Sequence, residues 1–213
     1  MKTICALFRS THGGTAAEFG LLTPLLLSFM IGTIDVGRFL WACNRAEKAT
    51  QIGVRYAVTN DVVPSGLATY DFAVSGSVPQ GNPVTTAQFN YAHCTDTVAK
   101  VVTCICDPNP CPGGIDATKA SAAFENIFLQ MSYFYPELTR DRVEIDYDNV
   151  NPSGATSGLG YAGDPNGIQV SPLVTVKLTG MTFTPMLFRF FGSATVSLPA
   201  YTASLTLEDG KTG

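Results

Sequence analysis

The 213-residue sequence predicts an α+β fold, in which a long N-terminal transmembrane helix continues into a folded domain with a second helix and an antiparallel sheet. Three observations support this prediction. An uncharged apolar run covers residues 19–34, helix-forming sequence continues to about residue 57, and alternating segments typical of strands follow. Because the elements run helix, irregular strands, helix and three strands, we expect an antiparallel sheet packed on helices.

The N-terminal apolar run is long enough to cross a bilayer. A helix over residues 16–35 would extend about 30 Å at about 1.5 Å per residue. Lys2 and Arg9 precede it without an acidic residue, so the positive-inside rule predicts a cytoplasmic N-terminus and a domain across the membrane. A cleaved secretory signal and a plain anchor are the competing interpretations. Against a signal peptide, Glu18 lies before the apolar run.

The start of this run carries an unusual carboxylate. Glu18 and Phe19 follow Gly13, Gly14 and three small residues. A carboxylate in a membrane helix costs about 2.5–3.5 kcal/mol at the centre and less near the interface, so it requires a cationic partner. Cleavage after Gly13 would create an α-amine at Gly14 and make Glu18 the fifth residue of the mature chain.

The arrangement resembles a type IV prepilin processing site, in particular that of the TadE-like minor pseudopilins of tight-adherence (Flp) pilus systems. The similarity continues through Pro24, Ile34-Asp35-Val36-Gly37-Arg38 and Gly53-Val54-Arg55-Tyr56-Ala57, over about the first quarter of the chain. The leader departs from the family pattern, because Arg9 and His12 stand where a basic pair is usual. The resemblance implies leader removal by a prepilin peptidase, pairing of Glu18 with the Gly14 amine, and a pilin-like layout in which the long helix packs on a sheet.

The helix is expected to continue beyond the bilayer. Asp35 and Arg38 are three residues apart and form a predicted ion pair at the outer interface. Asn60-Asp61 and Pro64 are the predicted stop signals. Small residues recur on one face and either dock on the chain's own sheet or pack against another subunit. They are Ala42, Ala46, Ala49, Gly53 and Ala57.

Several segments of the remaining chain have recognisable periodicity. Residues 70–74 alternate as a strand, and a second helix is expected from Asp116 or Thr118 to about Tyr135. A half-exposed strand is predicted at residues 142–147.

The C-terminal part is predicted to contain a loop and two longer strands. Residues 151–167 are rich in Gly, Ser, Asn and Pro, as in a long surface loop. The strands are expected at residues 169–179 and 194–207. The apolar connection at residues 183–192 is interpreted as a hairpin tip, either buried in the core or exposed as a contact for a membrane or a partner.

Four cysteines cluster in the middle of the chain: Cys94, Cys104, Cys106 and Cys111. In an oxidising compartment they are disulfide candidates, with three possible pairings. Zinc binding with His93 is an alternative, although the spacing is not that of paired C-x-x-C sites. Asp146, Asp148, Asn149 and Asn151 resemble a calcium loop only loosely, and a solvated turn is the preferred interpretation.

Composition excludes some classes of function. No Lys/Arg stripe is present, and the segment after Arg45 carries an excess of acidic residues, so no nucleic-acid partner is expected. No hydrolase, nucleotide-binding or metalloprotease motif is present, and neither an enzyme nor a cofactor or metal is predicted.

We therefore predict a minor pilin-like membrane subunit for assembly of a tight-adherence pilus or a related secretion machine. The expected parts are a cytoplasmic leader (1–13), a TadE-like helix (14–60) and a periplasmic or extracellular domain (61–213). The expected partners are a prepilin peptidase, other pilus subunits, the inner-membrane assembly platform and the lipid bilayer. The alternative is an unprocessed, single-pass membrane-anchored binding or adhesion module.

Overall fold

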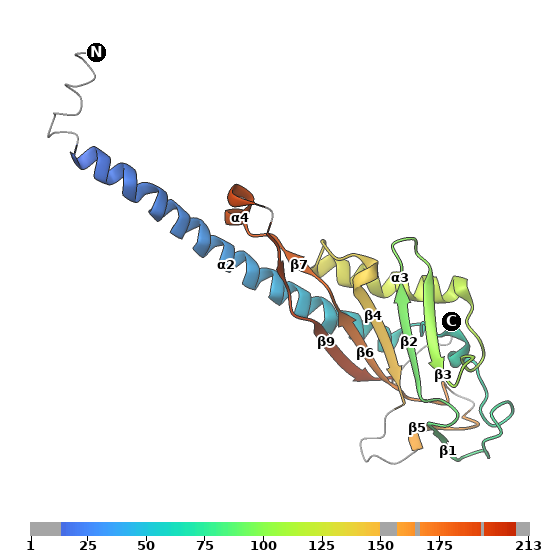
Figure 1. Ribbon diagram of the computed structural model, residues 1–213. Helices are drawn as coiled ribbons and strands as arrows, with labels where there is room; N and C mark the ends of the chain where they lie inside the picture. The colour runs from blue at the N-terminus through green and yellow to red at the C-terminus, as the bar shows by residue number, and fades with distance from the viewer. Residues whose placement is uncertain (1–13, 150–156, 165–166, 193, 208–213) are drawn as a thin grey trace. The chain divides into compact units, whose positions relative to one another are not determined.

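The computed structural model describes residues 14–149, 157–164, 167–192 and 194–207 (Figure 1). The predicted class is confirmed, since a long apolar helix, two further α-helices and an antiparallel sheet are present. The helices are α2 (Gly14–Thr59), α3 (Ala117–Phe134) and α4 (Met186–Phe191), with 3₁₀ turns η2 (Ser65–Ala68) and η3 (Arg140–Arg142). The strands are β1 (Pro83–Thr85), β2 (Tyr91–Asp96), β3 (Val102–Asp107), β4 (Val143–Asp148), β5 (Ser157–Tyr161), β6 (Leu173–Leu178), β7 (Thr182–Phe183), β8 (Val196–Ser197) and β9 (Tyr201–Thr206).

The chain divides into two compact units. One comprises Met1–Ala42 with Thr182–Val196, and the other comprises Cys43–Met181 with Ser197–Gly213. We refer to them as the N-terminal helical unit and the sheet unit. Helix α2 contributes to both, ending at Thr59 close to the predicted position.

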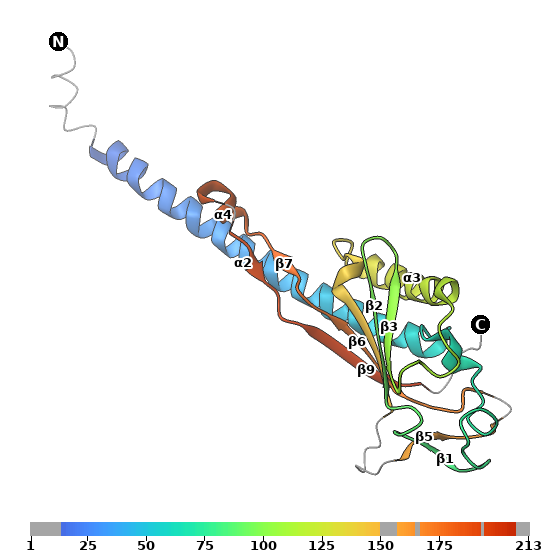
Figure 2. The same ribbon diagram turned by 45° about the vertical axis from the view of Figure 1, so that its right-hand side comes forward.

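The sheet unit is built on five antiparallel strands in the order β3-β2-β4-β6-β9. One row across this sheet places Cys94 opposite both Cys104 and Ile145, and Ile145 opposite Val176. The adjacent row places His93 opposite Asp146, and Asp146 opposite Thr175, so apolar and polar side chains alternate between the two faces. Figures 1 and 2 show α3 and the C-terminal part of α2 against the same face of the sheet.

Helix α3 begins where its sequence predicts. The Asp116 side chain accepts hydrogen bonds from the N–H groups of Thr118 (2.9 Å) and Lys119 (3.2 Å), so Asp116 is the N-cap. The helix buries Phe124, Ile127 and Met131, and its periodicity therefore reflects core packing.

The small residues of α2 let α3 approach closely. A Cβ added at Gly53 would lie 2.7 Å from the Met131 sulfur, so only glycine fits this crossing without displacement. Ala46, Ala49 and Ala57 are fully buried. Within the sheet unit, Gly53 of the small-residue stripe thus packs against α3, whereas the first of the two interpretations named the sheet as the partner.

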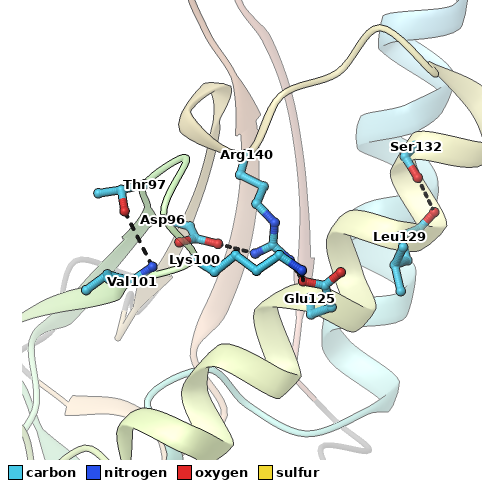
Figure 3. Close-up of polar contacts among 8 residues, drawn as sticks. All are labelled: Asp96, Thr97, Lys100, Val101, Glu125, Leu129, Ser132 and Arg140. Atoms are coloured by element: carbon cyan, nitrogen blue, oxygen red, sulfur yellow. Dashed lines mark hydrogen bonds and ion pairs between the residues drawn. The ribbon is translucent and has the colours of Figure 1, made fainter.

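Buried polar groups in the sheet unit have specific partners. The Tyr147 hydroxyl accepts a hydrogen bond from the Val63 N–H at 3.1 Å, and burial raises the Tyr147 pKa well above its usual range. Arg140 forms an ion pair with Asp96, whose side chain is 0% exposed (Figure 3). Arg140 also pairs with Glu125 of α3 and lies 5.0 Å from the Phe128 ring centre, so it connects the loop before β4 to α3.

The strand predicted at residues 70–74 is wrong. This segment forms a turn, in which Asp71 Oδ1 accepts hydrogen bonds from the N–H groups of Ala73 (2.9 Å) and Val74 (3.2 Å). Hydrogen bonds from Gln169 and from these N–H groups lower the Asp71 pKa. The local side-chain bonds of Asp71 therefore replace a strand ladder.

Other predicted segments are corrected in detail. The segment 151–167 contains β5, which pairs with β1, so it is not a continuous loop. The strand predicted at residues 142–147 is present as β4, but it is mostly buried rather than half-exposed. The strand predicted at 194–207 is interrupted around Pro199, separating β8 from β9. The hairpin predicted around residues 183–192 is present, since β7 pairs with β8, but its tip contains the short helix α4.

Candidate membrane and assembly segment

The first half of α2 keeps its polar groups bonded within the helix. Thr23 Oγ1 donates to the Phe19 carbonyl at 2.6 Å, and Ser28 Oγ donates to the Pro24 carbonyl at 2.8 Å. Pro24 lies inside the helix and has no N–H to donate to the preceding turn. Because these hydroxyl groups already donate to backbone carbonyls, they need no hydrogen bond to water, and this half of the helix can lie in an apolar solvent.

The same half of α2 has an extensive apolar surface. The part of the chain that the structure describes contains one helix, Ala16–Thr59, that is long and apolar enough to cross a membrane. Only 6% of its most apolar stretch is buried in the chain, unlike the core helix of a soluble domain. In this half and the turn after it, the large apolar residues that are more than half exposed are Phe19, Leu21, Leu22, Leu25, Leu26, Leu27, Phe29, Met30, Ile34, Val36, Leu40 and Trp41.

The predicted processing and assembly residues lie at the start of α2. Gly14 is its first residue, whereas Gly13 lies outside the described residues. Glu18 is exposed one turn later, on the same face of the helix as Gly14, and Phe19 beside it is 71% exposed. No hydrogen bond or ion pair joins the Glu18 carboxylate to another residue within the described ranges. An exposed carboxylate before an apolar surface is thus available to an external cation.

Asp35 and Arg38 form the predicted ion pair, with Arg38 NH1 2.9 Å from Asp35 Oδ1. The structure adds a role for Asp35 that the sequence analysis missed. Its two carboxylate oxygens accept hydrogen bonds from the N–H groups of Met186 (2.9 Å) and Leu187 (2.8 Å), the first two residues of α4. These donors have no partner within their own helix. The available sequence signal is Pro185, directly before the first helical residue.

The cysteine cluster forms two pairs in the sheet unit. Cys94 of β2 pairs with Cys104 of β3, with their Cα atoms 4.1 Å apart, and Cys106 pairs with Cys111 at a Cα separation of 5.0 Å. This arrangement selects one of the three pairings. It also contradicts the zinc alternative, because bonded sulfur atoms supply no thiolate ligands.

The polar residues near β4 contact one another rather than forming an open metal site. Asp146 contacts His93 through one oxygen and Lys177 through the other, the latter at 2.5 Å. The Asn149 amide donates to the Phe89 carbonyl at 2.7 Å. Asn151 lies outside the described residues. Within the parts of the chain that are described, no group of three or more His, Cys, Asp or Glu residues could hold a metal ion.

The fold and this segment define an α+β protein with a candidate single membrane-spanning helix near its N-terminus. A family model described as "TadE-like protein" matches residues 13–55. The N-terminal segment, about a fifth of the chain, is therefore similar to TadE-like proteins. No curated protein and no solved structure matches the chain.

Proposed function

We propose that the chain is a minor pilin-like subunit, a pseudopilin without enzymatic activity, for assembly of a tight-adherence type IV pilus or a related secretion machine. One observation carries the proposal. The TadE-like match at residues 13–55 coincides with the exposed apolar half of α2, and Glu18 is the fifth residue after the expected cleavage at Gly13. In this role the protein contributes a membrane helix to an assembly.

The chemistry of the N-terminus supports this role. Hydrolysis of the Gly13–Gly14 peptide bond by a prepilin peptidase would leave a protonated amine at Gly14. Glu18 lies four residues away on the same face, about 6 Å along the helix axis at about 1.5 Å per residue. The Glu18 carboxylate then pairs with this amine or with the amine of a neighbouring subunit. Such a pair offsets part of the desolvation cost when subunits pack in the bilayer.

The proposed location is the inner (cell) membrane, crossed once. Lys2 and Arg9 favour a cytoplasmic N-terminus, which places the sheet unit in the periplasm or outside the cell. The pairs Cys94–Cys104 and Cys106–Cys111 suit that side, because disulfides persist in oxidising compartments. The proposed partners are the prepilin peptidase, the other pilus subunits and the assembly platform.

Two measurements in the native host test the proposal. Mass spectrometry of the mature N-terminus should find a chain that starts at Gly14. Glu18→Ala should weaken copurification with pilus subunits by about 100-fold, since an unpaired buried charge costs about 3 kcal/mol or more. Glu47→Ala is the matched control, because Glu47 is an exposed carboxylate of the same helix within the sheet unit.

The proposal predicts that the variants reach the membrane in equal amounts and that only Glu18→Ala loses its partners. An N-terminus at Met1 with unimpaired Glu18→Ala would contradict it and leave an unprocessed, membrane-anchored binding or adhesion module. A start beyond Ile34 would identify a cleaved secretory signal and a protein without a membrane helix.

A further inference from the structure

Helix α4 is attached to α2 at a defined position in the N-terminal helical unit. Asp35 accepts the N–H groups of Met186 and Leu187 and also binds Arg38. The attachment continues in β7, where the Phe183 ring lies 5.6 Å from Phe39 in an edge-to-face arrangement and Arg38 lies 5.2 Å above it. Asp35 is only 6% exposed, so these contacts surround its carboxylate.

The attachment point fixes the depth of α4 in a bilayer. Asp35 directly follows the uncharged run at residues 19–34, which has the length of a hydrocarbon core. Trp41 lies six residues later, about 9 Å further along the axis, and is 67% exposed. Tryptophan side chains at the end of an apolar helix are typical of the membrane–water interface. If α2 spans the bilayer as proposed, Asp35 and the start of α4 lie between the hydrocarbon core and the interface.

The composition of α4 suits this depth. Met186 and Phe188 are 46% and 41% exposed, so this short helix presents two large apolar side chains at its surface. Arg189 is exposed as well and, together with Arg38, offers a cation to anionic lipid phosphates. The first two N–H groups of α4 have no acceptor within the helix, and leaving them without a hydrogen bond in a low-dielectric region would be costly. Both donate to the Asp35 carboxylate instead.

An apolar cavity of about 270 Å³ lies between the two elements. Its walls include Gly32, Val36 and Phe39 of α2, and Phe183 and Leu187 of the segment that contains α4. The cavity adjoins the exposed apolar surface of α2, since Val36 lines it and is itself 60% exposed. Apolar walls of this kind suit an occupant with a flexible hydrocarbon chain.

We propose that α4 is a second membrane contact, an interfacial anchor that lies at the boundary of headgroups and acyl chains at the Asp35 end of the span. Its exposed Met186 and Phe188 contact lipid, and a phospholipid acyl chain occupies the cavity between α4 and α2. Asp35 is the positioning residue that holds the anchor at this depth. This proposal depends on the proposed membrane span of α2, whereas processing and pilus assembly are separate from it.

Depth-dependent fluorescence quenching tests the anchor in the full-length protein. The chain has a single tryptophan, so Trp41→Phe provides a background in which one tryptophan at a time is introduced. The three probes are Phe188→Trp in α4, Phe29→Trp within the span and Tyr133→Trp, which replaces a 79% exposed residue of α3. Each variant is reconstituted at low density in phosphatidylcholine vesicles with acyl chains brominated either near the carbonyl or near the terminal methyl.

The expected result is loss of Phe188→Trp emission with bromines near the carbonyl, and no quenching by aqueous acrylamide. Phe29→Trp should be quenched by the deeper bromines, and Tyr133→Trp only by acrylamide. Adding Asp35→Ala should move the Phe188→Trp signal towards acrylamide quenching, because α4 loses its attachment. Met186→Trp repeats the measurement at the neighbouring exposed position if Phe188→Trp does not fold.

Three results would overturn the proposal. Quenching of the α4 probe by acrylamide alone would place α4 in water. Shielding of this probe from both quenchers would mean that protein, including a second copy of the chain, covers α4. Failure of the lipid quenchers on Phe29→Trp would refute the membrane span and the anchor together, whereas quenching of Phe29→Trp without quenching of Phe188→Trp refutes the anchor alone.

Discussion

Replacing Arg140 with methionine should destabilise the sheet unit more than most single changes in it. The guanidinium is the cationic partner of Asp96, whose side chain is 0% exposed, and Arg140 itself is 9% exposed (Figure 3). Asp96 Oδ1 is buried without a hydrogen-bond partner among the described residues, so the carboxylate depends on the bond from Arg140 to Oδ2. Arg140→Met retains most of the aliphatic stem while it removes the charge.

The expected loss in the free energy of unfolding is about 3–5 kcal/mol, the usual cost of leaving one member of a buried ion pair without its partner. The neighbouring pair gives a contrast in magnitude. Lys100 Nζ lies 3.5 Å from Glu125 Oε2, but Lys100 is 66% exposed. Water and salt screen that attraction, so Lys100→Met should cost less than about 1 kcal/mol.

Urea denaturation of the full-length protein in a mild detergent, followed by far-UV circular dichroism, measures both losses. The double variant Asp96→Asn with Arg140→Met removes the buried charge as well as its partner. It should therefore be more stable than Arg140→Met alone by about 2 kcal/mol or more, a coupling typical of residues in contact. A loss below about 1 kcal/mol for Arg140→Met, or a double variant no more stable than this single one, would refute the reasoning.

Three further changes test other features of the sheet unit. Asp116→Ala removes the cap of α3 and should lower the free energy of unfolding in urea by about 0.5–2 kcal/mol, whereas equal losses for Asp116→Asn would contradict the cap. Burial and the nearby Asp146 carboxylate raise the Asp148 pKa above its ordinary 3.8, so ionisation of Asp148 opposes folding. This penalty is absent below about pH 3.8 and develops as pH rises through the raised pKa. Asp148→Asn should therefore raise the melting temperature at pH 7 and leave it unchanged near pH 3. A lower melting temperature of the variant at pH 7 would contradict a destabilising effect of Asp148 ionisation. Replacing Cys94 and Cys104 by serine opens a link across 10 residues and should cost about 2–3 kcal/mol in urea, and an unchanged midpoint would show that the link adds no stability.

The long helix was the most predictable part of the structure. Its apolar run, the later helix-forming sequence and the stop signals near Asn60 act over neighbouring residues, and α2 accordingly ends at Thr59. The cap and apolar face of α3 are local in the same sense, so Asp116 could be identified before any packing was known. The strand predicted at residues 70–74 from alternating apolar and polar residues is absent, because the Asp71 side chain accepts hydrogen bonds from the backbone and forms a turn.

Pairings between distant segments were not predictable. The glycine-rich segment at 151–167 contains β5 because β1, about 70 residues earlier, supplies the ladder partner. Four cysteines allowed three pairings, and the sheet register selects one by placing Cys94 opposite Cys104. Both pairings depend on where distant segments of the chain lie, and the periodicity of apolar residues within one segment carries no information about that.

By itself, the sequence determined the exposed apolar helix, the position of Glu18 at its start and the TadE-like match, because each depends on residues that are contiguous along one helix. Only the tertiary structure decided what Asp35 does. The sequence predicts its local pair with Arg38, whereas the bonds to Met186 and Leu187 join residues 151 and 152 positions apart. A buried carboxylate is stabilised by whichever donors the fold brings to it, and here the fold brings the unbonded N–H groups at the start of α4.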